Sequence, residues 1–339
     1  MLAAVCALLV ACADGESAAD HSAAGSSGSH PGASGGSASD GGASAAAGRE
    51  QTGGAAGSGD GPSPRGACPA AKRLGRFAVE RQKDFGVVQG TILDGVVPTS
   101  VPELVEEQDG CSLLRRRNLS CSPACTSSET CGEKGKCIAY PRQISVGTVT
   151  IDGLTKKVTM EAQQPGAVYF APGQDNPPFL PTAVVQLEAA GAASIDAFEL
   201  FGRGSKPVAE PSVWLLEQDK PLELTWLAGT DATTIGVELT IDQHGSSPLS
   251  LSCEFPDGGT GRIPATLVNQ LITSGVSGFP NGRFVRHSVD HVEVERGCIE
   301  LSVGSALAAR VRVAGFTPCK TSADCPSGTT CDVAQERCF

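Results

Sequence analysis

The sequence has few aromatic residues and few histidines, and this scarcity limits the chemistry open to the protein. Phe, Trp and Tyr make up 4% of the chain, with only 2 Trp and 2 Tyr. Of the 5 histidines, His21 and His30 lie in a Gly/Ser-rich segment and are expected to be solvated. A histidine-dependent mechanism would therefore have to use His244, His287 or His291. The net charge of −11 argues against nucleic acid as a partner.

Long apolar runs and catalytic motifs are missing as well. No segment after the N-terminus reaches the roughly 18 consecutive apolar residues of a membrane-spanning helix. There is no C-x-x-C pair with histidines at zinc-finger spacing, and the stretch Gly275-Val-Ser-Gly278 stops one residue short of a G-x-S-x-G nucleophile turn. No glycine motif for a phosphate or a dinucleotide is present either. We therefore expect no enzyme activity and no cofactor.

A short apolar run at the start of the chain ends in Leu9-Val-Ala-Cys12, which matches the cleavage site of a bacterial lipoprotein. The pattern predicts a lipoprotein signal peptide over residues 1–12, with a lipid on Cys12 after cleavage. An ordinary signal-peptidase cut after Ala11-Cys-Ala13 stays open, as does a start codon further upstream, because no Lys or Arg precedes the run. Both cuts predict export. Ala13 is no acidic retention signal, which favours the outer membrane, and a soluble secreted or periplasmic location stays the alternative.

Residues 13–67 contain no Val, Ile, Leu, Met or aromatic residue and consist mainly of Gly, Ser, Ala and Asp. Such a segment cannot bury enough apolar surface to offset the entropy lost on ordering, so we expect a disordered tether. As a flexible coil it has a root-mean-square reach of about 40 Å. A lipid at one end and a folded body at the other would make this segment a stalk.

The cysteines of the body predict a disulfide framework. Of the 14 cysteines, Cys6 leaves with the signal peptide and Cys12 is lipidated or removed, so 12 remain. An even number in an exported protein is typical of disulfides. Two polar cassettes share one spacing, Cys125-Thr-Ser-Ser-Glu-Thr-Cys131 and Cys325-Pro-Ser-Gly-Thr-Thr-Cys331. Spacing does not determine connectivity. The pairs that we expect are Cys121–Cys131, Cys125–Cys137, Cys319–Cys331, Cys325–Cys338, Cys68–Cys111 and Cys253–Cys298.

The apolar patterning of the body is that of β-strands. Apolar and polar residues alternate through residues 222–226, 235–241 and 249–255. This period of two, with one polar face, predicts antiparallel sheets that are half exposed to water. We expect an all-β fold, with a disulfide-stapled sandwich of the immunoglobulin or fibronectin-III type at 142–316. A small Cys-rich domain at 68–141 would precede it, and a Cys cassette at 317–339 would follow. One helix is expected to begin at Pro264, and Trp226 is expected in the core on an inner strand.

A few residues are candidates for a functional site. On a helix, His287 and His291 would share one face with Asp290 as a third metal ligand, whereas on a strand the two histidines stand about 13 Å apart. The valines around them favour the strand, so we expect no metal site and retain these three as candidates. The stretch Asp242-Gln-His244-Gly245 places an acid beside an imidazole, with a loop between strands as the alternative. Sugar binding would need exposed rings, for which Trp214 and Tyr169-Phe170 are candidates.

Three runs of the body carry a resemblance to a known group of proteins. They are Leu222-Glu-Leu-Thr-Trp226, Val237-Glu-Leu-Thr-Ile241 and Cys253-Glu-Phe-Pro-Asp-Gly258. Together with the cassettes and the tether, they resemble uncharacterised Cys-rich surface lipoproteins of Gram-negative bacteria. The likeness covers the layout of most of the chain. It implies a cell-envelope location and brings no activity or catalytic residue with it.

Every recognisable motif in the sequence is one for export, for tethering or for stability. We therefore expect an exported, lipid-anchored envelope protein with a non-catalytic binding or structural role. Its partners would be the membrane, through the lipid, and a surface protein or a polysaccharide. Two alternatives stay open: a module that binds carbohydrate or cell-wall polymer, and a hydrolase that is metal-assisted through His287 and His291.

Overall fold

The computed structural model describes residues 63–209, 211–229, 233–245 and 248–339. The predicted signal peptide, the lipidation of Cys12 and the predicted tether up to residue 62 lie outside the described residues. Residues 63–67, which the sequence assigns to a disordered tether, instead lie against the folded body, where Gly66 N donates to Val289 O at 3.0 Å. That boundary of the tether is therefore wrong.

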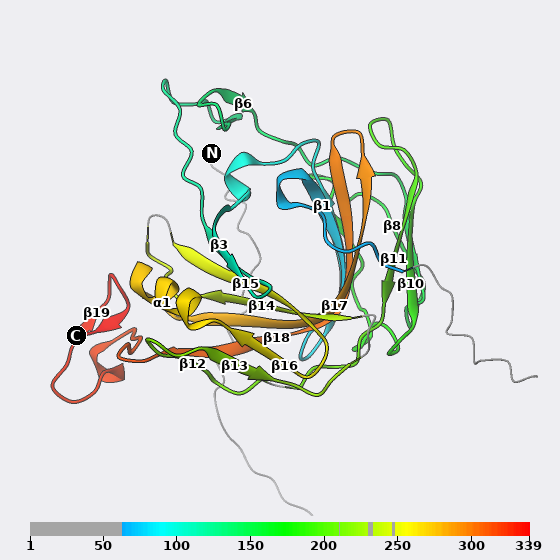
Figure 1. Ribbon diagram of the computed structural model, residues 1–339. Helices are drawn as coiled ribbons and strands as arrows, with labels where there is room; N and C mark the ends of the chain where they lie inside the picture. The colour runs from blue at the N-terminus through cyan, green and yellow to red at the C-terminus, as the bar shows by residue number, and fades with distance from the viewer. Residues whose placement is uncertain (1–62, 210, 230–232, 246–247) are drawn as a thin grey trace, which may run out of the picture. The chain divides into compact units, whose positions relative to one another are not determined.

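The described residues form a largely β structure that is built on one ten-stranded sheet (Figure 1). Its strands follow the order β3 (Glu103–Gln108), β4 (Cys111–Arg115), β15 (Leu249–Pro256), β14 (Thr234–Thr240), β17 (Asn281–Val294), β18 (Gly297–Val313), β1 (Arg73–Arg81), β2 (Gly86–Ile92) and β9 (Tyr169–Phe170), with β12 (Trp214–Leu216) paired to β18 outside this path. The predicted all-β class is confirmed. However, β18 pairs in parallel with both β1 and β12, so the sheet is mixed. Alternating polarity shows which face of a strand is buried, not the direction of its neighbour.

One face of this sheet carries the hydrophobic cores, as the period of two predicts. Phe77 of β1, Ile235 of β14, Leu251 of β15 and Leu301 of β18 are buried on that face. The residues between them in each strand point the other way. The opposite face, which we call the open face, carries mostly polar and small residues of the same strands, together with Val285 and Val289.

The first core lies between the large sheet and a four-stranded sheet. The order of the smaller sheet is β11 (Phe198–Arg203), β10 (Val184–Ala189), β7 (Val149–Asp152) and β8 (Val158–Met160). Strand β11 contacts β17 and β18. Ile151 and Leu187 of the small sheet share this core with Phe77 and Leu301 of the large one. The two layers form a β-sandwich, as the sequence predicts, but the large sheet is mixed and includes strands that precede residue 142.

The second core is covered by the two-stranded antiparallel sheet of β13 (Leu222–Thr225) and β16 (Thr260–Ile263) and by helix α1 (Ala265–Ser274). The helix contacts β15 and buries Leu267, Val268 and Leu271, which are one apolar stripe. Pro264 occupies the N-cap and not the first helical position. The predicted helix is thus confirmed, with its start shifted by one residue.

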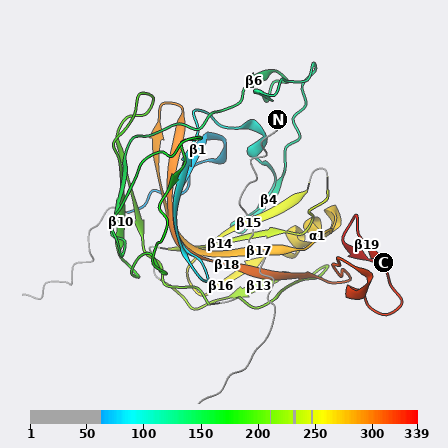
Figure 2. The same ribbon diagram turned by 180° about the vertical axis from the view of Figure 1, so that it is seen from behind.

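The long hairpin of β17 and β18 passes through both cores. Phe284 of β17 belongs to the second core, and Val292 of the same strand packs against the first. Between them, the core-facing positions of β17 are the buried polar residues Arg286, Ser288 and Asp290, which we call the polar band. Figures 1 and 2 show that the large sheet bends between the two cores, with the open face on the inside of the bend.

Six disulfides connect the cysteines of the described chain. The four cassette pairs are those predicted. The predicted pairs Cys68–Cys111 and Cys253–Cys298 are wrong, because the structure joins Cys68 to Cys298 and Cys111 to Cys253. Cys111 of β4 lies directly opposite Cys253 of β15, and the start of β1 is in register with Cys298 of β18. The prediction assumed pairing within each segment, whereas the sheet brings distant strands together.

The predicted boundary at 141/142 is wrong for the same reason. Strands β1 to β4 come from the predicted small domain, yet they belong to the same sheet as β14, β15, β17 and β18. Within that segment, β5 (Glu129–Cys131) and β6 (Cys137–Ala139) form the first cassette. The second cassette contains η3 (Ser322–Asp324), β19 (Cys331–Asp332) and β20 (Arg337–Cys338), and two further short 3-10 helices are η1 (Ala70–Lys72) and η2 (Pro98–Ser100).

Candidate functional site: a cleft on the open face

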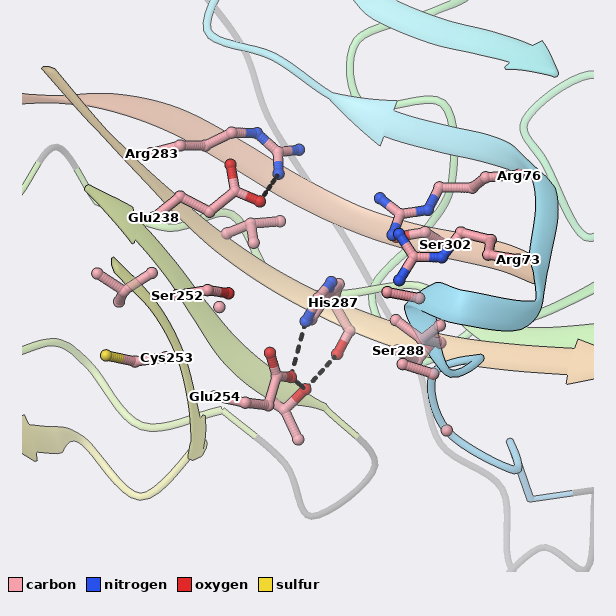
Figure 3. Close-up of a pocket in the computed structure, with 18 of the residues that line it drawn as sticks. Arg73, Arg76, Glu238, Ser252, Cys253, Glu254, Arg283, His287, Ser288 and Ser302 are labelled. Atoms are coloured by element: carbon pink, nitrogen blue, oxygen red, sulfur yellow. Dashed lines mark hydrogen bonds and ion pairs between the residues drawn. The ribbon is translucent and has the colours of Figure 1, made fainter. Parts of the chain in front are cut away.

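A cleft of about 1200 Å³ occupies the open face of the large sheet. Its lining comes from β1, β4, β11, β14, β15, β17 and β18, from Thr182, from residues 63–70 and from the connection at 93–102 (Figure 3). We call it the sheet cleft. Its charged and titratable lining residues are Arg73, Arg76, Arg203, Arg283, His287, Glu238 and Glu254.

Small residues make room for the cleft. Gly236 of β14, Ser252 of β15 and Ser302 of β18 all line it, and each faces away from the cores. A Cβ atom added at Gly236 would lie 2.8 Å from the side chain of Val285, so even alanine would crowd this part of the floor. The same alternation that builds the cores therefore leaves a shallow floor of small side chains on the other face.

Two arginines meet one buried carboxylate at one end of the cleft. The side chain of Glu300, on β18, is fully buried and accepts hydrogen bonds from Cys68 N at 2.7 Å and from Arg76 Nε at 2.9 Å. Arg73 Nε lies 3.2 Å from the same carboxylate but is not aligned for a hydrogen bond. Burial lowers the pKa of Arg73, the Glu300 carboxylate raises that pKa, and the charge of Arg76 lowers it again, with a net decrease.

A histidine and a carboxylate pair in the middle of the cleft. His287 Nε2 and Glu254 Oε1 are 2.8 Å apart, and the hydroxyl of Thr234 also donates to Glu254. Burial raises the pKa of Glu254, but the bond and charge of His287, the Thr234 hydroxyl and the charge of Arg76 outweigh it, so that this pKa is lowered. Glu254 is therefore an ionised acceptor near neutral pH. In the described part of the chain, no serine, threonine or cysteine donates a hydrogen bond to the His287 ring.

The predicted metal ligands do not come together. All three lie on β17, where His287 pairs with Glu254, whereas His291 Nδ1 lies 2.8 Å from Gly66 O. Asp290 points to the core face and accepts bonds from Arg65 and from Phe201 N. These three candidates therefore do not form a metal site: Asp290 faces the core, and the two histidines, on the other face of the strand, bond to different partners. The described residues do gather Cys121, Cys125 and Cys131, and Cys319, Cys325 and Cys331, but these sulfurs form disulfides.

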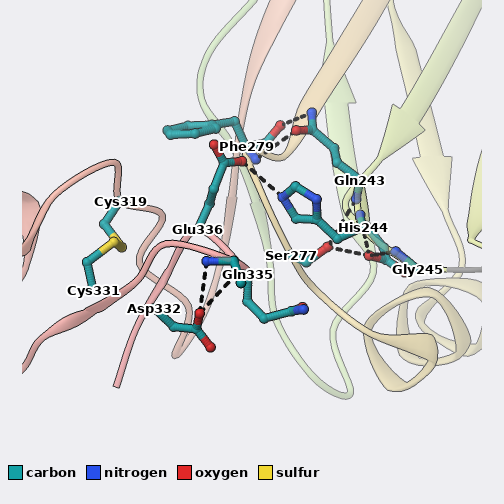
Figure 4. A network of polar contacts seen from close by, with 12 residues as sticks. Gln243, His244, Gly245, Ser277, Phe279, Cys319, Cys331, Asp332, Gln335 and Glu336 are labelled. Carbon is teal, nitrogen blue, oxygen red and sulfur yellow. Dashed lines mark hydrogen bonds and ion pairs between the residues drawn. A yellow bond between two sulfur atoms is a disulfide. The ribbon is translucent and has the colours of Figure 1, made fainter.

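His244 attaches the second cassette to the body. The Ser277 hydroxyl donates to Asp242 and accepts from His244 N at 3.0 Å, so the acid and the serine hold a turn (Figure 4). The His244 ring points away from that serine, and its Nε2 lies 3.1 Å from Glu336 Oε2 of the cassette. The loop predicted as the alternative is found, and these three residues do not form a catalytic triad.

The candidate sugar-binding rings are mostly buried. Trp214 is 2% exposed and Tyr169 0%, and the Tyr169 hydroxyl donates to Gly147 O at 2.8 Å. Phe170 alone of these candidates is exposed. Trp226 lies just after β13, partly buried, with its ring N–H donating to Asp257 Oδ1 at 2.9 Å. Stacking of a sugar on Trp214 or Tyr169 is therefore excluded.

Sequence reasoning missed Arg73, Arg76 and Glu300. One signal was available, since Glu300 interrupts the run Cys298-Ile-Glu-Leu301 and a charge inside a buried strand needs partners. The identity of those partners depends on the parallel pairing of β1 with β18, which no local sequence pattern predicts.

No protein-family model, no curated protein and no solved structure matches this chain. The resemblance to surface lipoproteins thus stays a prediction. Among the described residues, none of the helices has the length and apolar character needed to cross a membrane.

Proposed function

We propose that the protein is a lipid-anchored protein of the cell envelope that binds a partner in the sheet cleft and catalyses no reaction. The observation that carries the binding role is the cleft itself, which is large, open and lined by paired charges on a rigid sheet. The six disulfides of the described residues are typical of a protein that folds in an oxidising, extracytoplasmic compartment, which supports the envelope location.

The chemistry of the cleft supports binding more than catalysis. His287 and Glu254 bond to each other, and Arg76 bonds to Glu300, so these groups position charge and are not aimed at a nucleophile. The hydrolase alternative depended on a metal at His287, Asp290 and His291, and those side chains lie on two faces of β17. We therefore do not propose it.

The anchor is tested on the mature N-terminus. We expect mass spectrometry of protein purified from membranes to show a diacylglyceryl group on Cys12. We expect Cys12→Ser to move the protein to the soluble fraction, whereas the control Cys6→Ser, which lies earlier in the same apolar run, leaves it membrane-bound. An unmodified N-terminus in membrane-free material would contradict the anchor.

The binding role is tested with isolated envelope material. Ser252→Tyr places a ring in the floor of the cleft, and we expect it to reduce co-sedimentation of the purified protein with envelope fragments at least tenfold. Thr225→Tyr is the control, because Thr225 is exposed on β13, on a strand that covers the second core. Equal binding by the wild-type protein and Ser252→Tyr would show that the partner site lies elsewhere.

A further inference from the structure

We infer that the partner of the sheet cleft is an acidic carbohydrate, whose anionic group binds to Arg73 and Arg76. This inference rests on the proposed binding function and names the chemical class of the ligand. The shared chemistry is a carboxylate or a phosphate on a polyhydroxylated chain, as in a uronic acid or a sugar phosphate.

The first step is the charge at one end of the cleft. Two guanidinium groups share the buried charge of Glu300, and the charge of Arg76 also acts on Glu254, which is bonded to His287. Cys68 N already occupies the other oxygen of that carboxylate. Figure 3 shows Arg73 and Arg76 side by side, with Ser302 next to them. An incoming anion would meet two guanidinium groups here and one buried carboxylate, Glu300, whose two oxygens already accept bonds.

The second step is the supply of free donors. A guanidinium carries five N–H donors, and the described residues use only Nε of Arg76. Nη2 of Arg73 makes one long contact, 3.4 Å to Cys68 O. The terminal N–H groups of the pair are therefore available to an incoming carboxylate or phosphate, for which arginine has the matching planar geometry.

The third step is the asymmetry of the cleft. At its far end Arg283 is already neutralised, with Nη2 2.7 Å from Glu80 and Nη1 3.8 Å from Glu238. Glu254 in the middle is ionised and held by His287. An anionic group is thus attracted to the Arg73 end in preference to the Arg283 end, and the remainder of the ligand would extend along the floor between them.

The fourth step is the character of the rest of the lining. Hydroxyl side chains are spread around the cleft, at Ser63, Ser100, Thr182, Thr234, Ser252 and Ser302. A hydroxyl both donates and accepts, which suits a ligand that carries many hydroxyl groups. Trp214 and Tyr169 are buried, so a neutral sugar would find neither of these rings to stack on. Charged and hydroxyl groups therefore alternate here with apolar side chains such as Val97, Val285 and Val289.

The test is calorimetric titration of the full chain with three oligosaccharides of equal length: a uronic-acid tetramer, a phosphorylated one and a neutral one. We expect the acidic ligands to bind and the neutral one not to bind, with affinity that falls as salt is added. Arg76→Gln removes a charge-assisted contact and should weaken binding about 10- to 100-fold. Arg262→Gln, an exposed arginine on β16 paired with Glu223, should leave the affinity unchanged.

A second variant keeps the arginines in place. Ser302→Asp puts a carboxylate beside both guanidinium groups, so it should abolish binding while the thermal stability of the protein is kept. Preference for the uronate or for the phosphate would identify the source of the anion. Equal binding of the neutral ligand, or binding only of an acidic peptide such as oligo-glutamate, would overturn the inference but leave a binding cleft. If Ser252→Tyr loses envelope binding but the wild-type protein binds none of the three oligosaccharides, the proposed binding function stands and this inference is wrong.

Discussion

The clamp between Arg65 and Asp290 allows a quantitative prediction about the start of the folded body. Asp290 accepts bonds from Arg65 N at 2.8 Å, Arg65 Nε at 2.8 Å and Arg65 Nη2 at 3.0 Å, and from Phe201 N at 2.9 Å. The Asp290 side chain is 2% exposed, whereas the Arg65 side chain is 49% exposed. Arg65→Ala would leave a buried carboxylate with the bonds of two backbone N–H groups and no opposite charge.

Removal of one partner of a fully buried ion pair costs about 3–5 kcal/mol. Because Arg65 is half exposed and solvent screens its charge, we expect Arg65→Ala to lower the free energy of unfolding by about 2 kcal/mol at pH 7. For a body of this size the melting temperature would fall by roughly 3–4 °C. Urea unfolding with the disulfides intact, followed by tryptophan fluorescence, measures the difference.

The pH dependence of this effect has a definite sign. Burial raises the pKa of Asp290, but the bonds of Arg65 and Phe201 lower it more, so the folded pKa lies below the model-peptide value. A carboxyl with a lowered pKa stabilises the fold above its unfolded pKa of about 3.9, and this contribution disappears as the pH falls through the folded value. In Arg65→Ala the effect of burial on the Asp290 pKa is no longer offset by Arg65. Protonation of Asp290 at low pH then removes the unfavourable buried charge and reduces the destabilisation of the variant. The difference in the free energy of unfolding between the wild-type protein and Arg65→Ala should therefore decrease as the pH falls from 5 to 3.

The matched control is Asp290→Asn, which removes the titrating group, so the pH dependence that comes from Asp290 should vanish. A difference between the wild-type protein and Arg65→Ala that is constant from pH 7 to pH 3 would refute the assignment of the stabilisation to the ionised carboxylate. A difference below about 0.5 kcal/mol at pH 7 would place this pair among ordinary surface ion pairs.

Three further predictions concern the cores. Arg286→Leu should destabilise the protein by about 3–5 kcal/mol in urea unfolding, because it leaves Asp257 buried without an opposite charge, and replacement of both residues by leucine should recover much of that loss. Loss of the Cys111–Cys253 disulfide, which closes a separation of 142 residues, should cost up to about 5 kcal/mol in the chain-entropy model, more than the loss of a cassette disulfide. Gly90→Ala should cost about 1–3 kcal/mol by thermal melting, because the new Cβ would lie 2.2 Å from the buried Phe77 ring.

Local patterns were enough to predict the strands and the cassettes. The alternation through residues 235–241 and 249–255 gave the buried face of β14 and β15 correctly, because a half-buried strand shows its period directly in the sequence. The cassette disulfides were predictable since their cysteines are separated by only 10 to 13 residues. Short loops leave few geometries in which such a cassette can close.

The long-range partners could not be predicted. Cys68 and Cys298 are 230 residues apart, and their disulfide depends on the parallel pairing of β1 with β18. The same pairing brings Arg73 and Arg76 to Glu300 and so creates the charged end of the cleft. A single sequence records the exposure of each strand position but not which strand becomes its neighbour. The corrected disulfides, the corrected domain boundary and the missed arginines therefore share one cause.

The polar band of β17 links the stability of the fold to the shape of the cleft. Arg286, Ser288 and Asp290 stand where the core face would otherwise continue from one core to the other. Arg286 is bonded to Asp257 at 2.6 Å, and Ser288 accepts from Arg203 N at 2.6 Å. Buried ion pairs contribute little net stability compared with apolar residues of similar volume. Stability alone therefore does not explain why charged residues occupy these core-facing positions. A continuous apolar stripe would favour one merged core and a flatter sheet, whereas the polar band ends each core separately. The bend between the cores makes the open face concave. We therefore interpret the burial of these charges as the feature that separates the two cores and so allows a cleft on the other face.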